Sequence, residues 1–340
     1  MIHLQPTPDQ EEAAEAVASF LQAEMPIERL RPRGRELPLI RHRDQAKWAE
    51  MGALGFFGLG LEEDLGGVGL GVVEETLAFR EFGRYLVAPR VLGSVLGARV
   101  AARAGRADLV EGILAGTVPV GLLLTLEDEP GTAYLVDGAD AEWALTWNAG
   151  GAGLVDTAKL SDIEARESID STLEFAHVRL PASEPEIWVT ADVDPIPRRG
   201  DLLCAAMLVG LSEGTRDDSV EFAKMRKQFN QPIGSFQAVK HRCADMATRA
   251  AAAWAQILFA VLAEKERTED VVFQVTAAKL IATDTAIRNA QANIQNHGAT
   301  GFTSEVEAHH FLKRSHLLDQ VGTNQRRLRD RLLEQPAPPA

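Results

Sequence analysis

Residues 226–237 read Arg-Lys-Gln-Phe-Asn-Gln-Pro-Ile-Gly-Ser-Phe-Gln and separate two long stretches of helical periodicity. Before them, apolar residues from 203 to 211 share one helix face, and after them a longer apolar stripe runs from 243 to 261. Pro232 interrupts the helical pattern, and Ser235 is placed to cap the second stretch. The sequence here predicts a turn between two long antiparallel helices.

The C-terminal part of the chain continues with helical patterns joined by short loops. One runs from about 269 to 297 and stops at Gly298, a second runs from about 305 to 320, and a short third one follows. Long helices with short connections indicate a four-helix bundle, which we assign to residues 193–335. Residues 336–340 read Pro-Ala-Pro-Pro-Ala and predict a frayed tail.

Two other regions precede the bundle. Residues 1–117 have mostly helical periodicity. Residues 118–192 carry short apolar runs bounded by turn residues, and Asp137-Gly138 suits a hairpin turn. We therefore expect a mainly α-helical protein with an N-terminal helical domain, a small and reduced antiparallel β-domain, and the C-terminal four-helix bundle.

The 340 residues carry a formal net charge of -14, from 49 acidic and 35 basic side chains. A surface this negative repels phosphate backbones, so we expect no nucleic-acid partner. Cys204 and Cys243 lie far apart in apolar patterns and predict reduced thiols, as in a cytosol. The sequence shows neither an apolar run of about 18 residues nor a basic-then-apolar leader. We expect a cytoplasmic protein with no membrane partner.

Three motifs carry a specific resemblance. The first is the stretch 226–237, an Arg-x-x-Phe turn with Pro-Ile and Phe-Gln, followed by a helix with Ala-Asp-Met at 244–246. The second is Gln-Asn-His-Gly-Ala-Thr-Gly-Phe at 295–302, and a weaker third is Glu-Glu-Asp-Leu-Gly-Gly-Val-Gly at 62–69. With the order of the domains, they make nearly the whole chain resemble the acyl-CoA dehydrogenase family. The resemblance implies that family's fold and its cofactor, FAD.

In that family, the first two motifs hold the ADP half of an FAD that lies mostly in a neighbouring subunit. An arginine fork suits the pyrophosphate, and glycines let backbone amides approach the nucleotide. By resemblance, the cofactor-binding residues are Arg226, Gln228, Phe229, Ile233, Gln237, Gln295, Gly298 and Gly301. The alternative is that Arg226 merely ends its helix and that the glycines are plain caps.

The chain departs from the family at the catalytic base. The family's glutamate, which removes the α-proton of an acyl-CoA thioester, usually precedes a Gly-Thr pair. Here Gly322-Thr323 follows Val321, which cannot accept a proton, so this position predicts no catalytic residue. Some members place the base at the start of the first bundle helix, where Asp201 is the only carboxylate. Asp201 could equally be a charge near a helix N-terminus.

The middle domain departs from the family as well. The family's Thr-Glu-Pro-x-x-Gly-Ser-Asp stretch would fall at 125–131, where Glu127 and a Pro-Gly pair remain but the Gly-Ser-Asp ending is missing. The family's segment that covers the flavin ring is matched only weakly, by Trp-Ala-Leu-Thr at 143–146. The half of the site that would hold this chain's own flavin ring therefore looks eroded, whereas the half that reaches into a neighbour looks kept.

This asymmetry resembles the non-catalytic subunit of the α2β2 acyl-CoA dehydrogenases of actinobacteria that act on steroid side-chain CoA thioesters. We expect a subunit that completes the FAD site of a homologous catalytic partner and is inactive alone. The partner would supply the base and bind the acyl-CoA. One alternative is a self-sufficient homo-oligomeric dehydrogenase with Asp201 as its base. Another is a non-enzymatic protein like the family's DNA-associated branch, which the net charge opposes.

Histidines cluster in the C-terminal part of the sequence without completing a metal site. No neighbouring cysteine or Glu-x-x-His pair supplies the remaining ligands, so we expect no bound metal. The histidines in question are His297, His309, His310 and His316.

Overall fold

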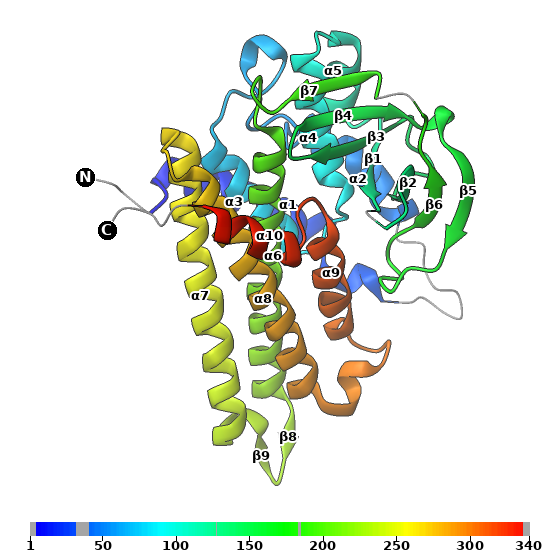
Figure 1. The fold of residues 1–340 in the computed structure, drawn as a ribbon. Coiled ribbons are helices and arrows are strands. Elements are labelled where there is room, and N and C mark those ends of the chain that lie inside the picture. Colours follow the sequence, from blue (N-terminus) through cyan, green and yellow to red (C-terminus); the bar gives the residue numbers. More distant parts are fainter. Residues whose placement is uncertain (1–4, 32–40, 127, 183–184, 336–340) are drawn as a thin grey trace.

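The computed structural model describes residues 5–31, 41–126, 128–182 and 185–335, with the side chains of 41–46 excepted. Glu127 and the expected tail 336–340 lie outside the described residues. Along the chain, helices come first, then a β-sheet, then a bundle of long helices (Figure 1). This order confirms the predicted fold class.

The N-terminal region folds into helices. They are α1 (Pro8–Glu24), α2 (Arg41–Ala53), α3 (Val72–Arg84), α4 (Arg90–Arg103) and α5 (Ala107–Leu114). A capping box starts α1: the Thr7 hydroxyl accepts a hydrogen bond from the Gln10 backbone N–H, and the Gln10 side chain accepts one from the Thr7 N–H.

The sheet has seven strands in the order β5-β6-β2-β1-β3-β4-β7. The strands are β1 (Val120–Thr125), β2 (Thr132–Val136), β3 (Trp143–Asn148), β4 (Gly151–Asp156), β5 (Ser161–Arg166), β6 (Phe175–Arg179) and β7 (Ile187–Thr190). Two expectations need correction. The sheet is mixed, because β1 and β3 run parallel. Asp137-Gly138 forms no hairpin, because β2 pairs with β1 and β6 instead of β3, and Asp137 exchanges hydrogen bonds with the Glu174 backbone.

The C-terminal part is a bundle of long helices. They are α6 (Ile196–Met225), α7 (Gln237–Glu266), α8 (Val271–His297) and α9 (Ala308–Gln320), and the shorter α10 (Gln325–Glu334) follows. A hairpin of β8 (Lys227–Gln228) and β9 (Gln231–Pro232) joins α6 to α7. The predicted cap Ser235 is wrong: Phe236 precedes α7, and the Ser235 hydroxyl donates to the Pro232 carbonyl instead.

Among the described residues, helix α7 is long and apolar enough to cross a bilayer by length and composition alone. Gln256 interrupts its apolar residues, so it is not an unbroken apolar run of about 18 residues, which the sequence lacks. Its buried side chains, such as Ile257 and Val261, belong to the main hydrophobic core.

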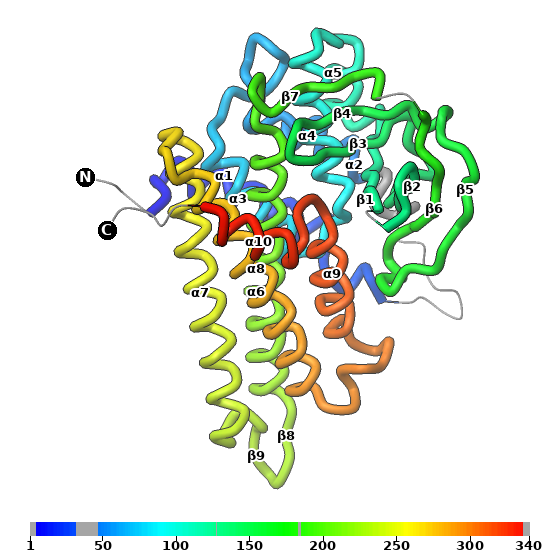
Figure 2. Tube along the Cα trace, in the orientation of Figure 1, coloured from blue at the N-terminus to red at the C-terminus, as the bar shows by residue number. Residues whose placement is uncertain are grey.

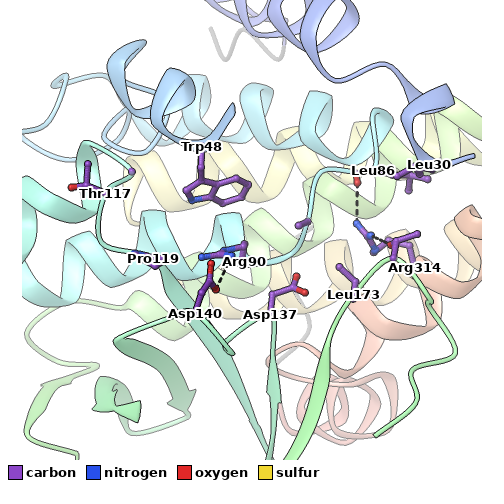
Figure 3. Close-up of a pocket in the computed structure, with 13 residues that line it drawn as sticks. Leu30, Trp48, Leu86, Arg90, Thr117, Pro119, Asp137, Asp140, Leu173 and Arg314 are labelled. Atoms are coloured by element: carbon purple, nitrogen blue, oxygen red, sulfur yellow. Dashed lines mark hydrogen bonds and ion pairs between the residues drawn. The ribbon is translucent and has the colours of Figure 1, made fainter. Parts of the chain in front are cut away.

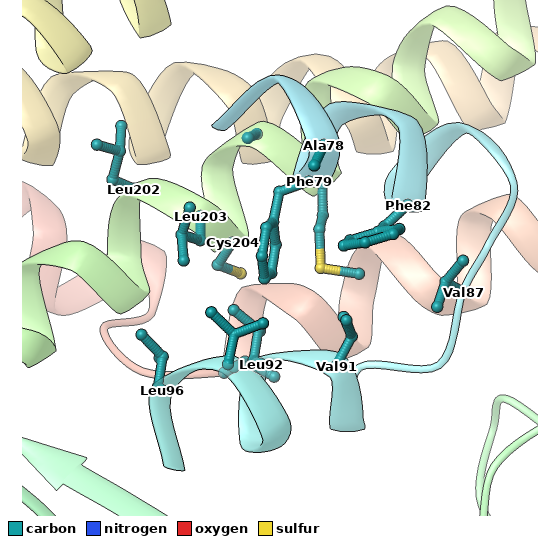
Figure 4. Packing of buried hydrophobic residues seen from close by; sticks show 14 of the residues in the cluster. Ala78, Phe79, Phe82, Val87, Val91, Leu92, Leu96, Leu202, Leu203 and Cys204 are labelled. Carbon is teal, nitrogen blue, oxygen red and sulfur yellow. The ribbon is translucent and has the colours of Figure 1, made fainter. Parts of the chain in front are cut away.

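Part of the main core lies where α3 and α4 meet α6. Two glycines let α3 and α6 touch: a Cβ on Gly83 would lie 1.9 Å from the Met207 carbonyl oxygen, and one on Gly210 would lie 1.7 Å from that of Arg80. The long helix α6 is therefore shared by the N-terminal core and the bundle. The side chains buried around this contact include Phe79, Phe82, Leu92, Leu96 and Leu203 (Figure 4).

Candidate functional site

The structure brings both predicted cofactor motifs to one end of the bundle. The hairpin after α6, the start of α7 and the last turn of α8 lie at this end (Figure 2). Side chains tie the three helices together there, because Arg242 of α7 donates to Asn296 of α8 at 2.6 Å and Asn296 donates to Ser219 of α6 at 2.6 Å. We call this region the bundle end.

Arg226 ends α6 and is exposed. Within the described part of the chain, its side chain makes no hydrogen bond or ion pair, so its guanidinium is available to an external anion. Gln228, Gln237 and Gln295 are exposed at the same end. Arg226 therefore ends its helix and still has a guanidinium available for a cofactor, so the two roles considered from the sequence do not exclude each other.

Phe229 stands out at the tip of the β8–β9 hairpin. Its side chain is 86% exposed and meets Phe236 edge to face at 6.0 Å. Phe229 and Asn230 have φ angles of 50° and 59°, in the left-handed region that costs a side chain such as Phe about 1–2 kcal/mol. A strained backbone that holds an aromatic ring in solvent is typical of a residue that contacts something outside its own chain.

Of the remaining predicted residues, one has open space for a ligand and two serve the packing of this chain. Gly298, with φ 61° and ψ -139°, ends α8 in a conformation that only glycine adopts readily, and it has open space around it. Gly301 is buried, and a Cβ there would lie 2.7 Å from the Ile294 carbonyl oxygen, so it serves close packing on α8. The backbone N–H of Ile233 donates to the Arg226 carbonyl within the hairpin and is not free for a ligand.

The position that the sequence analysis aligned with the family's catalytic base is apolar and closed. Val321 follows α9 and is fully buried. Next to it, Gly322 has φ 70°, and a Cβ there would lie 2.7 Å from Asp201 Oδ1 and 2.8 Å from Trp147 Nε1. The 321–323 turn therefore lies against Asp201 and the indole of Trp147.

Asp201 is held by a buried ion pair. The Lys279 ammonium donates to Asp201 Oδ1 at 2.8 Å and to the Val321 carbonyl, and both charged side chains are at most 3% exposed. Burial acts to lower the pKa of Lys279, but the Asp201 carboxylate, together with Cys204 and Asp319, outweighs it and the pKa stands above its ordinary value. Thr323 donates to Oδ1 through its N–H at 3.0 Å and to Oδ2 through its hydroxyl at 2.6 Å.

This geometry differs from both roles that the sequence left open for Asp201. The residue lies in the second turn of α6, and its charge is matched by Lys279 instead of the helix N-terminus. Both carboxylate oxygens already accept hydrogen bonds. Lys279 was missed in the sequence, although a lone charge within the apolar residues 277–282 was a signal that could have pointed to it.

A cleft of about 650 Å³ lies between the sheet and helices α9 and α10. Trp147 is at its wall, and the indole Nε1 is buried with no hydrogen-bond partner among the described residues. The sequence had pointed to 143–146 for the segment over a flavin ring, whereas the structure puts Trp147 at the cleft. Its lining also includes Tyr134, Phe175, Arg166, Arg326 and Arg327.

A second cavity, of about 80 Å³, lies where the N-terminal helices meet the sheet (Figure 3). Asp137 lines it with one carboxylate oxygen that has no partner among the described residues. Burial raises the pKa of Asp137 to about 6, although the Glu174 backbone and Arg90 oppose the shift. Arg90 donates to Asp140 and lies 5.3 Å from the centre of the Trp48 ring. None of the sequence motifs points to this cavity.

Three of the four histidines, His297, His309 and His310, contact other aromatic rings, whereas His316 is exposed at the lining of the cleft. His297 stacks on Phe222 with ring centres 4.0 Å apart, and His309 lies 4.1 Å from His310. Burial and the neighbouring His309 lower the pKa of His310 to about 3, so that ring is neutral at pH 7. Across the described ranges, no group of three or more His, Cys, Asp or Glu side chains could hold a metal ion.

Two places can be tested for their fit to FAD. The bundle end fits the nucleotide half, because an unpaired guanidinium and an exposed aromatic ring suit a pyrophosphate and an adenine. The cleft has room and one unpartnered N–H for a planar ring with acceptors, and Asp128 and Glu167 line it. At the 321–323 turn, Val321 is apolar and the Asp201 carboxylate is paired.

Comparisons with known proteins identify the family to which the chain belongs. Residues 7–118 match the model of the acyl-CoA dehydrogenase N-terminal domain, and residues 199–330 match that of the C-terminal domain. Acyl-CoA dehydrogenase IpdE2 of Mycobacterium tuberculosis is 30% identical over 307 residues, which cover 87% of this chain and 89% of that protein.

Solved structures show the same fold. The ChsE4-ChsE5 complex from Mycobacterium tuberculosis matches with a TM-score of 0.81 at 22% identity, covering 99% of this chain and 100% of the matched one. A variant of the Tcur3481-Tcur3483 steroid ACAD matches with a TM-score of 0.79 at 20% identity, covering 96% and 97%.

Proposed function

The chain belongs to the acyl-CoA dehydrogenase family, whose members are FAD-dependent oxidoreductases, and we propose that it is a non-catalytic subunit of a heteromeric enzyme of this family. It completes the FAD site of a homologous catalytic partner through the bundle end. The partner supplies the catalytic base and binds the acyl-CoA, and the assembly is α2β2 and cytoplasmic.

One observation carries this proposal: among the described residues of the 321–323 turn and its contacts, no carboxylate is free to act as a base. Val321 is buried and apolar, and Asp201 has both oxygens engaged by Lys279 and Thr323. A general base must be able to accept a proton at the reacting carbon. Neither residue meets this requirement, which favours a base from another chain over one from this turn.

At the bundle end, the chain contributes binding and positioning. Bound FAD supplies the hydride acceptor of the reaction. The unpaired Arg226 guanidinium provides two parallel donors for a pyrophosphate, and Phe229 offers a flat apolar surface to the adenine. The exposed amides of Gln237 and Gln295 add neutral hydrogen bonds. All these groups come from rigid helix ends or from the hairpin between them.

The substrate class follows from the comparisons and stays part of the proposal. The family acts on acyl-CoA thioesters, and one of the matched structures is described as a steroid ACAD. We propose a CoA thioester of a steroid side chain or a comparably bulky acyl group.

A second candidate function is a self-sufficient homo-oligomeric dehydrogenase. The cleft of about 650 Å³ favours it, because a chain that never holds a flavin ring has no need of such a space. This candidate requires a base other than Val321, and Asp201 would have to leave its pairing with Lys279.

Flavin content separates the two candidates. Purified alone, the chain should be colourless or nearly so. Co-expressed with its catalytic partner, it should give a yellow complex with one FAD per pair of chains. Visible absorbance against protein concentration measures the ratio. Stoichiometric FAD in the isolated chain would rule out the non-catalytic role and favour the homo-oligomer.

A further inference from the structure

The cavity of about 80 Å³ between the N-terminal helices and the sheet is separate from the cleft of about 650 Å³ (Figure 3). Among the described residues, the two spaces share no lining residue. Pro119, just before β1, lines the smaller space, and Thr125, at the far end of β1, lines the cleft. An extended chain rises about 3.3 Å per residue, so these two positions are about 20 Å apart. We call the smaller space the Asp137 cavity.

Two buried polar atoms in the wall of the Asp137 cavity have no hydrogen-bond partner among the described residues. One is Asp137 Oδ2; the other carboxylate oxygen accepts from the Glu174 N–H at 3.1 Å. The second atom is Arg90 Nε, whose neighbour Nη1 donates to Asp140 at 3.3 Å. Asp137 and Arg90 are only 5% and 7% exposed, so each unpaired atom is costly unless an occupant of the cavity pairs with it.

The other buried polar side chains at the wall are engaged within the chain. The Trp48 indole donates to the Ser94 hydroxyl at 3.1 Å. Every guanidinium nitrogen of Arg314 donates as well, to Asp170, to Thr172 and to the carbonyls of Leu86 and Val87. In Figure 3 the Asp137 carboxylate points into the space between Arg90 and Arg314. An occupant therefore meets one free acceptor and one free donor among these atoms.

The size and the walls of the Asp137 cavity suit an organic molecule better than water. One water takes about 10–15 Å³ of such a volume and makes about three hydrogen bonds, so there is room for roughly five to eight waters. Two unpartnered atoms can hold about one of them. Most of the remaining wall is apolar, because it is formed by Leu30, Trp48, Leu86, Ala88, Pro119 and Leu173.

The charges at the wall favour a neutral occupant. The lining has two cationic side chains, Arg90 and Arg314, and two carboxylates, Asp137 and Asp140. An added charge would have no counterion in this balanced and largely buried set, which makes its desolvation costly. A primary amide is neutral and carries N–H donors beside a carbonyl acceptor. It therefore complements Asp137 Oδ2 and Arg90 Nε together.

We propose that the Asp137 cavity is a binding site for a small molecule with a primary carboxamide on a short aliphatic body. The amide N–H donates to Asp137 Oδ2, its carbonyl accepts from Arg90 Nε, and the aliphatic part packs on Trp48 and Leu86. The occupant joins the N-terminal helices to the sheet. The site is independent of the heteromeric function, because it uses neither the bundle end nor the cleft.

The test is a titration of the full chain with isobutyramide at pH 8, where Asp137, with a pKa of about 6, is ionised. NMR signals of the ligand should show saturable binding with a dissociation constant in the millimolar range. N,N-dimethylacetamide is an isomer of isobutyramide without an N–H, so it should bind about 10–100-fold more weakly. Isobutyrate, which is charged, should also bind at least about 10-fold more weakly than isobutyramide.

Three variants locate the binding. Asp137→Asn keeps the shape but replaces an acceptor, and should weaken isobutyramide binding by about 10–100-fold. Asp162→Asn, the same change on the exposed strand β5, is the matched control and should have no effect. Ala88→Met fills the cavity from a half-buried position and should abolish binding with both polar atoms intact. Circular dichroism checks that each variant is folded.

Four results would overturn the inference. Equal affinity of the wild-type chain for isobutyramide and N,N-dimethylacetamide would remove the amide contacts, whatever the variants do. Affinity that Asp137→Asn or Ala88→Met leaves unchanged would put the amide elsewhere on the chain. Isobutanol that binds as tightly as isobutyramide would mean that a single hydroxyl bridges the two atoms. If none of the probes binds, the cavity holds water only.

Discussion

The buried Asp201–Lys279 pair should have a large and testable effect on stability. Lys279→Met keeps an unbranched side chain of similar length but removes the ammonium. The Asp201 carboxylate then stays buried with the hydrogen bonds from Thr323 and the ion pair with Arg331 at 3.5 Å. Removing one partner of a buried ion pair costs about 3–5 kcal/mol. Asp201→Asn, which strands the ammonium, should cost a similar amount.

The double variant isolates the interaction. Because Asp201→Asn with Lys279→Met leaves no unpaired charge, its cost should be far below the sum of the single costs, with a coupling of about 2–3 kcal/mol. Lys224→Met, which removes an exposed i,i+3 pair with Glu221 on α6, is the control and should have no measurable effect. Equilibrium urea unfolding, followed by circular dichroism at pH 7, gives the free energies.

Two results would refute this reasoning. Single variants that lose less than about 1 kcal/mol would mean that water reaches the pair and that the base position is open. The turnover of the complex provides the second test. Asp201→Asn should leave it within a few-fold of wild type at a temperature where the variant is folded. A loss of about 10²–10⁴-fold would instead make Asp201 a general base and favour the homo-oligomer.

Three other predictions concern the bundle end and the sheet. Arg226→Ala should weaken FAD binding by the complex by about 10–100-fold, with Arg226→Lys recovering only part, as measured by FAD titration; unchanged affinity would leave Arg226 a helix end only. Phe229→Gly and Asn230→Gly should both relieve the strain of a positive φ and stabilise the isolated chain against urea, Phe229→Gly by about 1 kcal/mol. Only Phe229→Gly should weaken FAD binding by the complex. Equal effects of the two variants on FAD affinity would contradict a role for the Phe229 ring. The pKa of Asp137, raised from 3.8 to about 6, gives stability that is present below pH 4 and lost as pH rises through 6. Asp137→Asn should therefore remove about 3 kcal/mol of the pH dependence of the unfolding free energy between those limits. Parallel curves of unfolding free energy against pH for the wild type and the variant would show that Asp137 is solvated.

The fold class and the bundle end were predictable because their signals are local. A helix or strand imprints its period on neighbouring residues, so the bundle could be recognised from the stretch 226–237 and the apolar stripes beside it. The prediction that Val321 stands in place of the base was also drawn from a local signal, the single position next to Gly322-Thr323. Capping was less predictable, and Ser235 failed because its hydroxyl bonds within the preceding turn.

Contacts between distant segments were decided by the tertiary structure alone. Asp201 and Lys279 are 78 residues apart, and each reads as an ordinary charge until α6 and α8 pack side by side and exclude water from both. The parallel pairing of β1 with β3 likewise leaves no mark on either strand's own pattern. The sequence by itself determined that Val321, an apolar residue, precedes Gly322-Thr323. That the Asp201 carboxylate beside this turn is paired with Lys279 follows only from packing, because the pairing of a charge depends on its neighbours in space.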